Sequence, residues 1–207
     1  MTGSNLTAVT PTVLIPVKGF SYAKGRLADR LSEQARSELA RSMATRVVQA
    51  AGSLPLRIVC NDREVEAWAR ALGAKVLQIA ADGLNPAVSA AVAALEAAAG
   101  PADSPGHVLI AHADLPLADT LTGLAESGTV TIVPDRHLDG TNVLSLPLGT
   151  GFQFRYGPGS FTAHCEEAMR CGLDLRVRRI AALAVDVDTP DDLDAAGLSL
   201  PVAADAS

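Results

Sequence analysis

An acidic side chain follows an apolar stretch of the chain at a position where it could bind a phosphorylated ligand. Residues 107–111 (HVLIA) form a short apolar run typical of a buried parallel strand, and Asp114 follows three residues later. In open α/β sheets, ligands bind at the carboxyl ends of the strands, and a carboxylate there can hold a hard cation such as Mg²⁺. Asp is also common in turns, so stabilising the turn is the alternative role of Asp114.

A basic loop follows the first apolar strand, which we expect at residues 13–17. It carries Lys18, Lys24 and Arg26 together with two glycines, and a polyphosphate site needs this combination of charge and flexible backbone. The loop is not a Walker A loop, because its sequence lacks the GxxxxGK[ST] pattern. A solvated basic loop without a ligand is the alternative.

A helix expected over residues 87–99 begins next to a residue that could recognise a nucleotide. Asn85 follows a glycine, and its amide both donates and accepts hydrogen bonds, so it could bind a base or a ribose. In the alternative interpretation, Asn85 is the N-cap of this helix and Pro86 is its first residue.

The second half of the chain holds a candidate anion site. Gly157 and Ser160 precede a helix expected over residues 161–171, so exposed N–H groups and the serine hydroxyl could hold an anion. An ordinary glycine-proline turn with a serine cap is the alternative. Thr141, in a polar turn between two strands, could contribute its hydroxyl, and His164 either faces the same anion or is simply packed.

Two further carboxylates alternate near the end of the chain. Asp186 and Asp188 lie on one face of a strand expected over residues 183–188, where carboxylates are costly unless they face water or a cation. Thr189, Pro190 and Asp192 form a capping-box pattern that predicts a helix start. The cation candidates are therefore Asp114, Asp188 and Asp186.

Strand and helix patterns alternate along the chain, which predicts an α/β fold with a mostly parallel central sheet flanked by helices. We expect one domain over residues 12–198, with flexible termini at residues 1–11 and 199–207. Strands are expected at 13–17, 57–60, 75–78, 107–111, 129–134, 143–146 and 183–188, and helices from 33, at 63–72, 87–99, 118–126 and 161–171, and after 189.

Composition excludes several classes of protein. The net charge of −6 disfavours a nucleic-acid-binding protein. No apolar run approaches the roughly 20 residues that span a bilayer, and the N-terminus does not resemble a signal peptide, so we expect no membrane partner. The three cysteines form no CxxC pair, which is typical of reduced thiols in a cytoplasmic protein. The oligomeric state stays open, and a homodimer is compatible with the sequence.

Six motifs, in order and over roughly residues 12 to 197, resemble the CofC/FbiD family of guanylyltransferases, within the MobA-like nucleotidyltransferase superfamily. The common GxGxR loop of nucleotidyltransferases is replaced here by the Lys/Arg loop. The motifs are IPVKGFSYAKGRL near the start, GLN at 83–85, ADLP at 113–116, PDRHLDGTNVL from 134, FRYGPGSFTAH at 154–164 and VDVDTPDDL from 185.

The resemblance implies a single-domain Rossmann-like fold that binds GTP and a small phosphorylated three-carbon acid in coenzyme F-420 biosynthesis. The acid would be phosphoenolpyruvate in the actinobacterial branch, 2-phospho-L-lactate in archaeal relatives and 3-phospho-D-glycerate in some bacterial relatives. The product would pass to the next enzyme of the pathway. Asp114 and Asp188 then resemble Mg²⁺ ligands, and Thr141, Gly157 and Ser160 resemble acceptor-binding residues.

Under this family resemblance, Lys24 is also a candidate catalytic residue, and Lys18, Lys24 and Arg26 would stabilise the leaving pyrophosphate. Two other interpretations of the sequence stay open. A protein of another class, a regulatory nucleotide-binding protein without catalysis, would use the same fold. A cytidylyl- or uridylyltransferase acting on sugar phosphates would keep the chemistry and change both substrates.

Overall fold

The computed structural model describes residues 7–98 and 106–198. Its strands are β1 (Thr12–Pro16), β2 (Leu56–Cys60), β3 (Lys75–Gln78), β4 (His107–Ala111), β5 (Thr129–Pro134), β6 (Thr141–Pro147) and β7 (Asp174–Val177). They form one sheet in the order β3-β2-β1-β4-β6-β5-β7, in which β6 runs antiparallel to its neighbours β4 and β5 and the other pairs are parallel. The predicted α/β fold with a mostly parallel sheet is confirmed.

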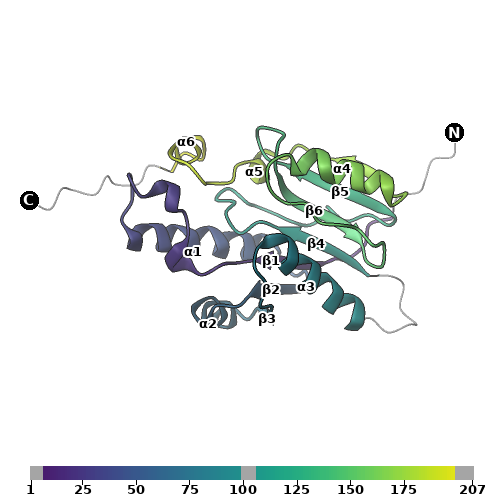
Figure 1. Cartoon of the computed structure of the whole chain (residues 1–207), viewed down its shortest axis with the longest axis horizontal. Helices are drawn as coiled ribbons and strands as arrows, with labels where there is room; N and C mark the ends of the chain where they lie inside the picture. Colours follow the sequence, from purple (N-terminus) through teal and green to yellow (C-terminus); the bar gives the residue numbers. More distant parts are fainter. Residues whose placement is uncertain (1–6, 99–105, 199–207) are drawn as a thin grey trace, which may run out of the picture.

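Helices cover both faces of this sheet (Figure 1). Along β1, Val13 and Ile15 point into one apolar layer with α1 (Glu33–Ala50) and α2 (Arg63–Ala71), because alternate strand residues face opposite sides. Leu14 points into the other layer, with α3 (Leu84–Ala98) and α4 (Ser160–Arg170). Two-sided burial explains why the central strands are continuous apolar runs.

A third apolar cluster joins three distant parts of the chain. It packs α1 against the short 3-10 helix η2 (Gly25–Leu27) and the C-terminal helix α6 (Pro190–Ala195), through Leu27, Met43 and Leu193 among others. In Figure 1 the yellow C-terminal segment accordingly lies beside the purple N-terminal part of the chain. This cluster holds the basic loop close to the segment that carries Asp188.

The helix predicted over residues 118–126 is wrong. Its apolar residues are buried, as the helical spacing suggested, but the backbone follows a chain of turns. The carboxylate of Asp119 accepts a hydrogen bond from the Thr120 amide, and the Thr120 hydroxyl accepts one from the Thr122 amide. Such local side-chain bonds compete with the helical hydrogen bonds.

The strand predicted over residues 183–188 is also wrong, and the seventh strand of the sheet is β7, which we did not predict. Residues 181–184 form the short helix α5 (Ala181–Ala184), and the backbone then crosses the end of the sheet. Its groups bond to loops: the Val187 amide donates to the Asp114 carbonyl, and the Arg136 amide donates to the Ala184 carbonyl. The apolar alternation arises because Leu183 and Val187 enter two different apolar clusters.

Part of the N-terminal segment that we expected to be flexible is attached to the domain. Ala8 forms a β-bridge with Glu126, and the Val9 amide donates to the Ala125 carbonyl. The remainder of that prediction, residues 1–6 and 199–207, lies outside the described residues. Among the residues that the structure does describe, no helix is long and apolar enough to cross a membrane.

Candidate active site

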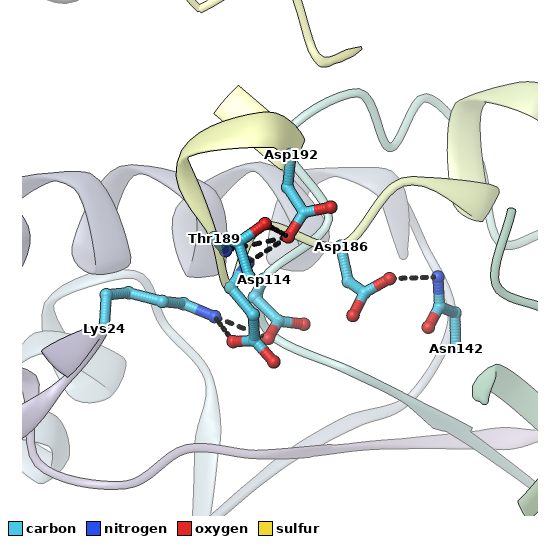
Figure 2. A network of polar contacts seen from close by, with 7 residues as sticks. Lys24, Asp114, Asn142, Asp186, Thr189 and Asp192 are labelled. Carbon is cyan, nitrogen blue, oxygen red and sulfur yellow. Dashed lines mark hydrogen bonds and ion pairs between the residues drawn. The ribbon is translucent and has the colours of Figure 1, made fainter. Parts of the chain in front are cut away.

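Three of the predicted residues converge at the carboxyl end of β4. Asp114 follows that strand, Asp188 precedes α6, and Lys24 lies between the 3-10 helix η1 (Phe20–Tyr22) and η2. The Lys24 Nζ donates to Asp114 Oδ2 at 2.7 Å and to Asp188 Oδ1 at 2.9 Å (Figure 2). One cationic atom therefore joins two carboxylates that are 74 residues apart in the sequence.

The charges of this cluster stabilise one another. Burial by itself would raise the pKa of Asp114, but the Lys24 ammonium outweighs it and holds that pKa below its ordinary value. Burial likewise disfavours the charged form of Lys24, yet Asp114 and Asp188 keep its pKa above the ordinary value. Both groups are therefore ionised around neutral pH.

The helix α6 fixes the position of Asp188. The predicted capping box is confirmed, since Asp192 Oδ2 accepts hydrogen bonds from the Thr189 hydroxyl and the Thr189 amide, both at 2.7 Å. The same oxygen accepts the Asp188 amide at 3.1 Å, and Asp192 Oδ1 accepts from Arg136 at 2.6 Å. Asp192 thus ties the backbone of Asp188 to the loop after β5.

Asp186 lies beside the other two carboxylates but contacts a different residue. Its Oδ1 accepts a long hydrogen bond of 3.4 Å from the side-chain Nδ2 of Asn142 at the start of β6 (Figure 2). Burial, followed by the charge of Asp114, raises its pKa above the ordinary value. A role for Asp186 in holding a metal stays a prediction.

The described part of the chain holds no group of three His, Cys, Asp or Glu residues able to bind a metal by themselves. A magnesium site that uses one or two protein carboxylates plus substrate phosphates needs no such group. Asp114 Oδ1 is buried without a hydrogen-bond partner, and such an oxygen can accept a metal bond. The donor set of Asp114 and Asp188 therefore fits Mg²⁺ arriving with a phosphorylated substrate.

Two more buried polar atoms without partners lie near Asp114. They are His112 Nε2 and the hydroxyl of Tyr156, and the rings of these residues are in contact at a centroid distance of 5.3 Å. The Tyr156 ring also meets the His164 ring edge to face, at 4.8 Å. Unsatisfied polar atoms concentrated in one place are typical of sites that a ligand completes.

His164 fixes the orientation of the Thr141 hydroxyl. His164 is completely buried, and its Nε2 accepts a hydrogen bond from the Arg155 amide at 3.0 Å. The neutral ring must then carry its proton on Nδ1, which donates to Thr141 Oγ1 at 3.0 Å. Because Thr141 Oγ1 accepts this bond, its own proton is available to another acceptor. Of the two alternatives for His164, the packed one is confirmed.

The backbone cradle that we predicted before α4 is wrong in one respect. Gly157 and Gly159 have left-handed φ angles of 127° and 72°, as a tight glycine loop requires. However, Asp139 already accepts hydrogen bonds from the amides of Gly159 and Phe161, and the Ser160 amide donates to the Gly157 carbonyl. These three donors are therefore occupied. Ser160 is buried, and anion binding by its hydroxyl stays a prediction.

The N-cap interpretation of Asn85 is wrong, because α3 already begins at Leu84. The Asn85 amide nitrogen donates to the Tyr156 carbonyl at 3.0 Å, and its oxygen accepts from the Tyr156 amide at 2.6 Å. These two hydrogen bonds to the Tyr156 backbone hold α3 against the loop that contains Tyr156. Nucleotide recognition by Asn85 stays a prediction.

The other basic residues of the N-terminal loop are available to a ligand. Lys18 and Arg26 are exposed, and neither forms an ion pair within the described residues. Leu27 and Phe20 are buried in the core and anchor this loop. The loop that carries Lys24 therefore also presents two unpaired cations, and triphosphate binding by Lys18 and Arg26 stays a prediction.

Replacing Gly140 by Ala should destabilise the loop that leads into Thr141. A Cβ on Gly140 would lie 2.8 Å from Asp135 Oδ2, the oxygen that accepts the Gly140 amide. We expect the free energy of unfolding to fall by about 1–3 kcal/mol in urea titrations, as overpacking typically costs. Gly25→Ala is the control, since its Cβ meets nothing within 4 Å; equal stability of the two variants would contradict the packing argument.

Comparison with known proteins decides the family. The family model described as "Guanylyl transferase CofC like" matches residues 11–198. The chain belongs to this family. It is 36% identical to the phosphoenolpyruvate guanylyltransferase of Roseiflexus castenholzii, with 87% of this chain and 84% of the relative covered. It is 30% identical to the 2-phospho-L-lactate guanylyltransferase of Methanocaldococcus jannaschii, with 87% and 80% covered.

A solved structure supports the fold assignment. A putative nucleotide-diphospho-sugar transferase from Desulfovibrio desulfuricans superposes with a TM-score of 0.65 and covers 90% of this chain and 85% of its own. At 15% identity, this likeness concerns the fold alone. The resemblance found in the sequence motifs and the predicted nucleotidyltransferase fold are both confirmed.

Several residues of the site were not predicted from the sequence. No sequence pattern predicts a role for His112 or Tyr156, because a histidine after a strand and a tyrosine in a glycine loop have no specific pattern. Arg136 was not predicted either, although it pairs with Asp192. The weak available signal was the motif itself, since Arg136 follows Asp135 in the polar stretch between β5 and β6.

Proposed function

We propose that this protein transfers GMP from GTP to phosphoenolpyruvate and releases pyrophosphate. The observation that carries the proposal is the convergence of Asp114 and Asp188 on a single cationic atom. The relatives named phosphoenolpyruvate guanylyltransferase, at 36% identity and similar values, supply the substrates. The product, enolpyruvyl-diphospho-guanosine, would pass to the next enzyme of coenzyme F-420 biosynthesis, and the three free thiols agree with a cytoplasmic location.

The reaction brings two anions together, so repulsion between phosphates is the main barrier. An oxygen of the acceptor phosphate forms a bond to the α-phosphorus of GTP, and the bond from that phosphorus to the bridging oxygen breaks, so the electron pair leaves with pyrophosphate. The acceptor phosphate is already ionised at neutral pH, and no general base is needed. Positioning and charge neutralisation are then the work of the protein.

We assign Asp114 and Asp188 to Mg²⁺, which when bound would neutralise charge between the two phosphates. Lys18 and Arg26 would bind the triphosphate and stabilise the leaving pyrophosphate, together with Lys24. Thr141 and Ser160 would bind the acceptor, Thr141 through the hydroxyl proton that His164 leaves free. Gly157 would let the backbone of the loop approach the same ligand.

The test is an assay with GTP, Mg²⁺ and each of three acids: phosphoenolpyruvate, 2-phospho-L-lactate and 3-phospho-D-glycerate. We expect pyrophosphate release and a product of the corresponding mass with phosphoenolpyruvate, if needed coupled to the next pathway enzyme because such products are labile. The Methanocaldococcus jannaschii relative makes 2-phospho-L-lactate the second candidate acceptor.

Replacement of GTP by CTP or UTP is the control for nucleotide choice. Activity with CTP and a sugar phosphate would favour a cytidylyltransferase instead. Binding of GTP without pyrophosphate release under any combination would contradict catalysis and favour a regulatory nucleotide-binding protein.

A further inference from the structure

The Lys24 ammonium occupies the position where a cation would bridge Asp114 and Asp188. It lies 2.7 Å from one carboxylate oxygen and 2.9 Å from the other, and only 9% of its side chain is exposed. Asp186 adds a third carboxylate close by. Three carboxylates gathered without a cation would repel one another, so Lys24 is what allows the free protein to keep them together.

The loop holds Lys24 there at some conformational cost. Lys24 adopts a left-handed backbone conformation, with φ 56° and ψ 42°, which is unfavourable for a residue that carries a Cβ. Phe20 and Leu27 are buried on either side of it and fix the course of the loop. The two ion pairs offset this strain, and a loop that gives them up can relax.

A metal ion bound to the same two oxygens cannot coexist with Lys24. Mg²⁺ binds carboxylate oxygens at about 2.0–2.1 Å. An ammonium already 2.7 and 2.9 Å from those oxygens would then lie against the ion, with like charges in contact. A metal on Asp114 Oδ1, which has no partner, would instead leave Lys24 in place.

We propose that Lys24 is a positioning residue that occupies the metal position of the nucleotide-free protein and must leave it before a divalent metal binds. This rests on the proposed function for the identity of the displacing ligand. The triphosphate of GTP would offer Lys24 new anionic partners, and Asp114 and Asp188 would then be free to hold a divalent metal. Metal binding is therefore weak without nucleotide and becomes strong with it.

The test measures Mn²⁺ binding without nucleotide, by electron paramagnetic resonance of the free ion or by calorimetry. We expect Lys24→Met to bind Mn²⁺ at least about tenfold more tightly than the wild type, because the competing ammonium is gone. Lys18→Met, which removes an exposed cation from the same loop, should bind Mn²⁺ like the wild type, as should Lys24→Arg, which keeps the charge.

A second readout follows the unfolding temperature. Lys24→Met should unfold at a lower temperature than the wild type in metal-free buffer, because Asp114 has lost its counter-charge, and added Mn²⁺ should raise that temperature more than in the wild type. If Lys24→Met is not obtained folded, Lys24→Gln, which keeps a polar side chain of similar length, replaces it in both measurements.

Unchanged or weaker Mn²⁺ binding by Lys24→Met, or by Lys24→Gln in its place, would overturn the proposal and place the metal on other oxygens with Lys24 still bound. This outcome is independent of the proposed function, because no measurement here involves guanylyl transfer. Conversely, absence of GMP transfer by the wild type would refute the reaction while leaving a gain of Mn²⁺ affinity in Lys24→Met intact.

Discussion

Asp114→Asn should lower the rate of guanylyl transfer by about a thousandfold. A bound metal contributes several kcal/mol of charge stabilisation, and each 1.36 kcal/mol corresponds to a factor of ten in rate. Asparagine keeps the shape of Asp114 and removes its charge, so both the hydrogen bond from Lys24 and the proposed bond to the metal would be weakened. The measurement is kcat/KM for GTP with phosphoenolpyruvate at saturating Mg²⁺.

The control for this variant is Asp191→Asn. Asp191 is exposed in the first turn of α6, three residues from Asp188, and contributes no group to the cluster. Its rate should stay within about threefold of the wild type, in line with the modest effects of surface substitutions. Transfer by folded Asp114→Asn at a rate near that of Asp191→Asn would refute the metal role of Asp114.

Acidification should destabilise the fold through two buried histidines. Burial, the largest cause in both cases, lowers the pKa of His107 and of His164 to about 4. In the unfolded chain each histidine takes up its proton near pH 6.5, so the unfolded state binds more protons as the pH falls. The free energy of unfolding is therefore unaffected by these two groups above pH 6.5. Between pH 6.5 and 4 it falls by roughly 3 kcal/mol for each histidine.

The hydrogen bonds of His107 and His164 show why protonation of these buried rings is unfavourable. His107 Nε2 is hydrogen-bonded to the Ser145 hydroxyl at 2.9 Å between β4 and β6. His164 Nε2 accepts the Arg155 amide, so a proton on this nitrogen would break that bond. Arg155 and His112 also lower the pKa of His164, and Glu167 opposes them.

Urea denaturation at pH 7 and pH 4.5 measures this loss. His107→Gln cannot titrate there, and its free energy of unfolding should fall by about 2 kcal/mol less than that of the wild type between the two pH values. His137→Gln, at an exposed position, is the control and should follow the wild type. The same loss in all three proteins would mean that His107 is not the responsible group.

The central strands could be predicted because their sequences admit few alternatives. The runs that became β1 and β4 are largely apolar on both faces, and a sheet covered by helices on both sides buries such segments. The capping box at Thr189 and the apolar stripe of α1 are likewise local patterns, and each is typical of a helix. These elements and their order were enough to predict the α/β fold.

The two wrong predictions of secondary structure, the helix over residues 118–126 and the strand over residues 183–188, share one cause. In both segments the apolar side chains are buried, but backbone hydrogen bonds are made to residues far away in the sequence. Leu121 and Leu124 are buried with a spacing that suits a helix, yet the Leu121 amide donates to the Ala50 carbonyl at the end of α1. Residues 185–187 alternate like a strand, but their hydrogen bonds go to loops at the end of the sheet. The local sequence does not predict where these distant hydrogen-bond partners lie.

By itself, the sequence determined the fold class and the family, and it singled out Lys24, Asp114 and Asp188, which the structure brings together. Residue type and order along the chain were sufficient for this, because strand ends and glycine loops place such residues at one edge of a sheet. The tertiary structure alone decided that Lys24 bridges Asp114 and Asp188, that Asp139 occupies the amides before α4, and that His164 orients Thr141. Each of these depends on distances between residues far apart in the chain, which are set by the packing of η2, α1 and α6 and of α4 against the sheet.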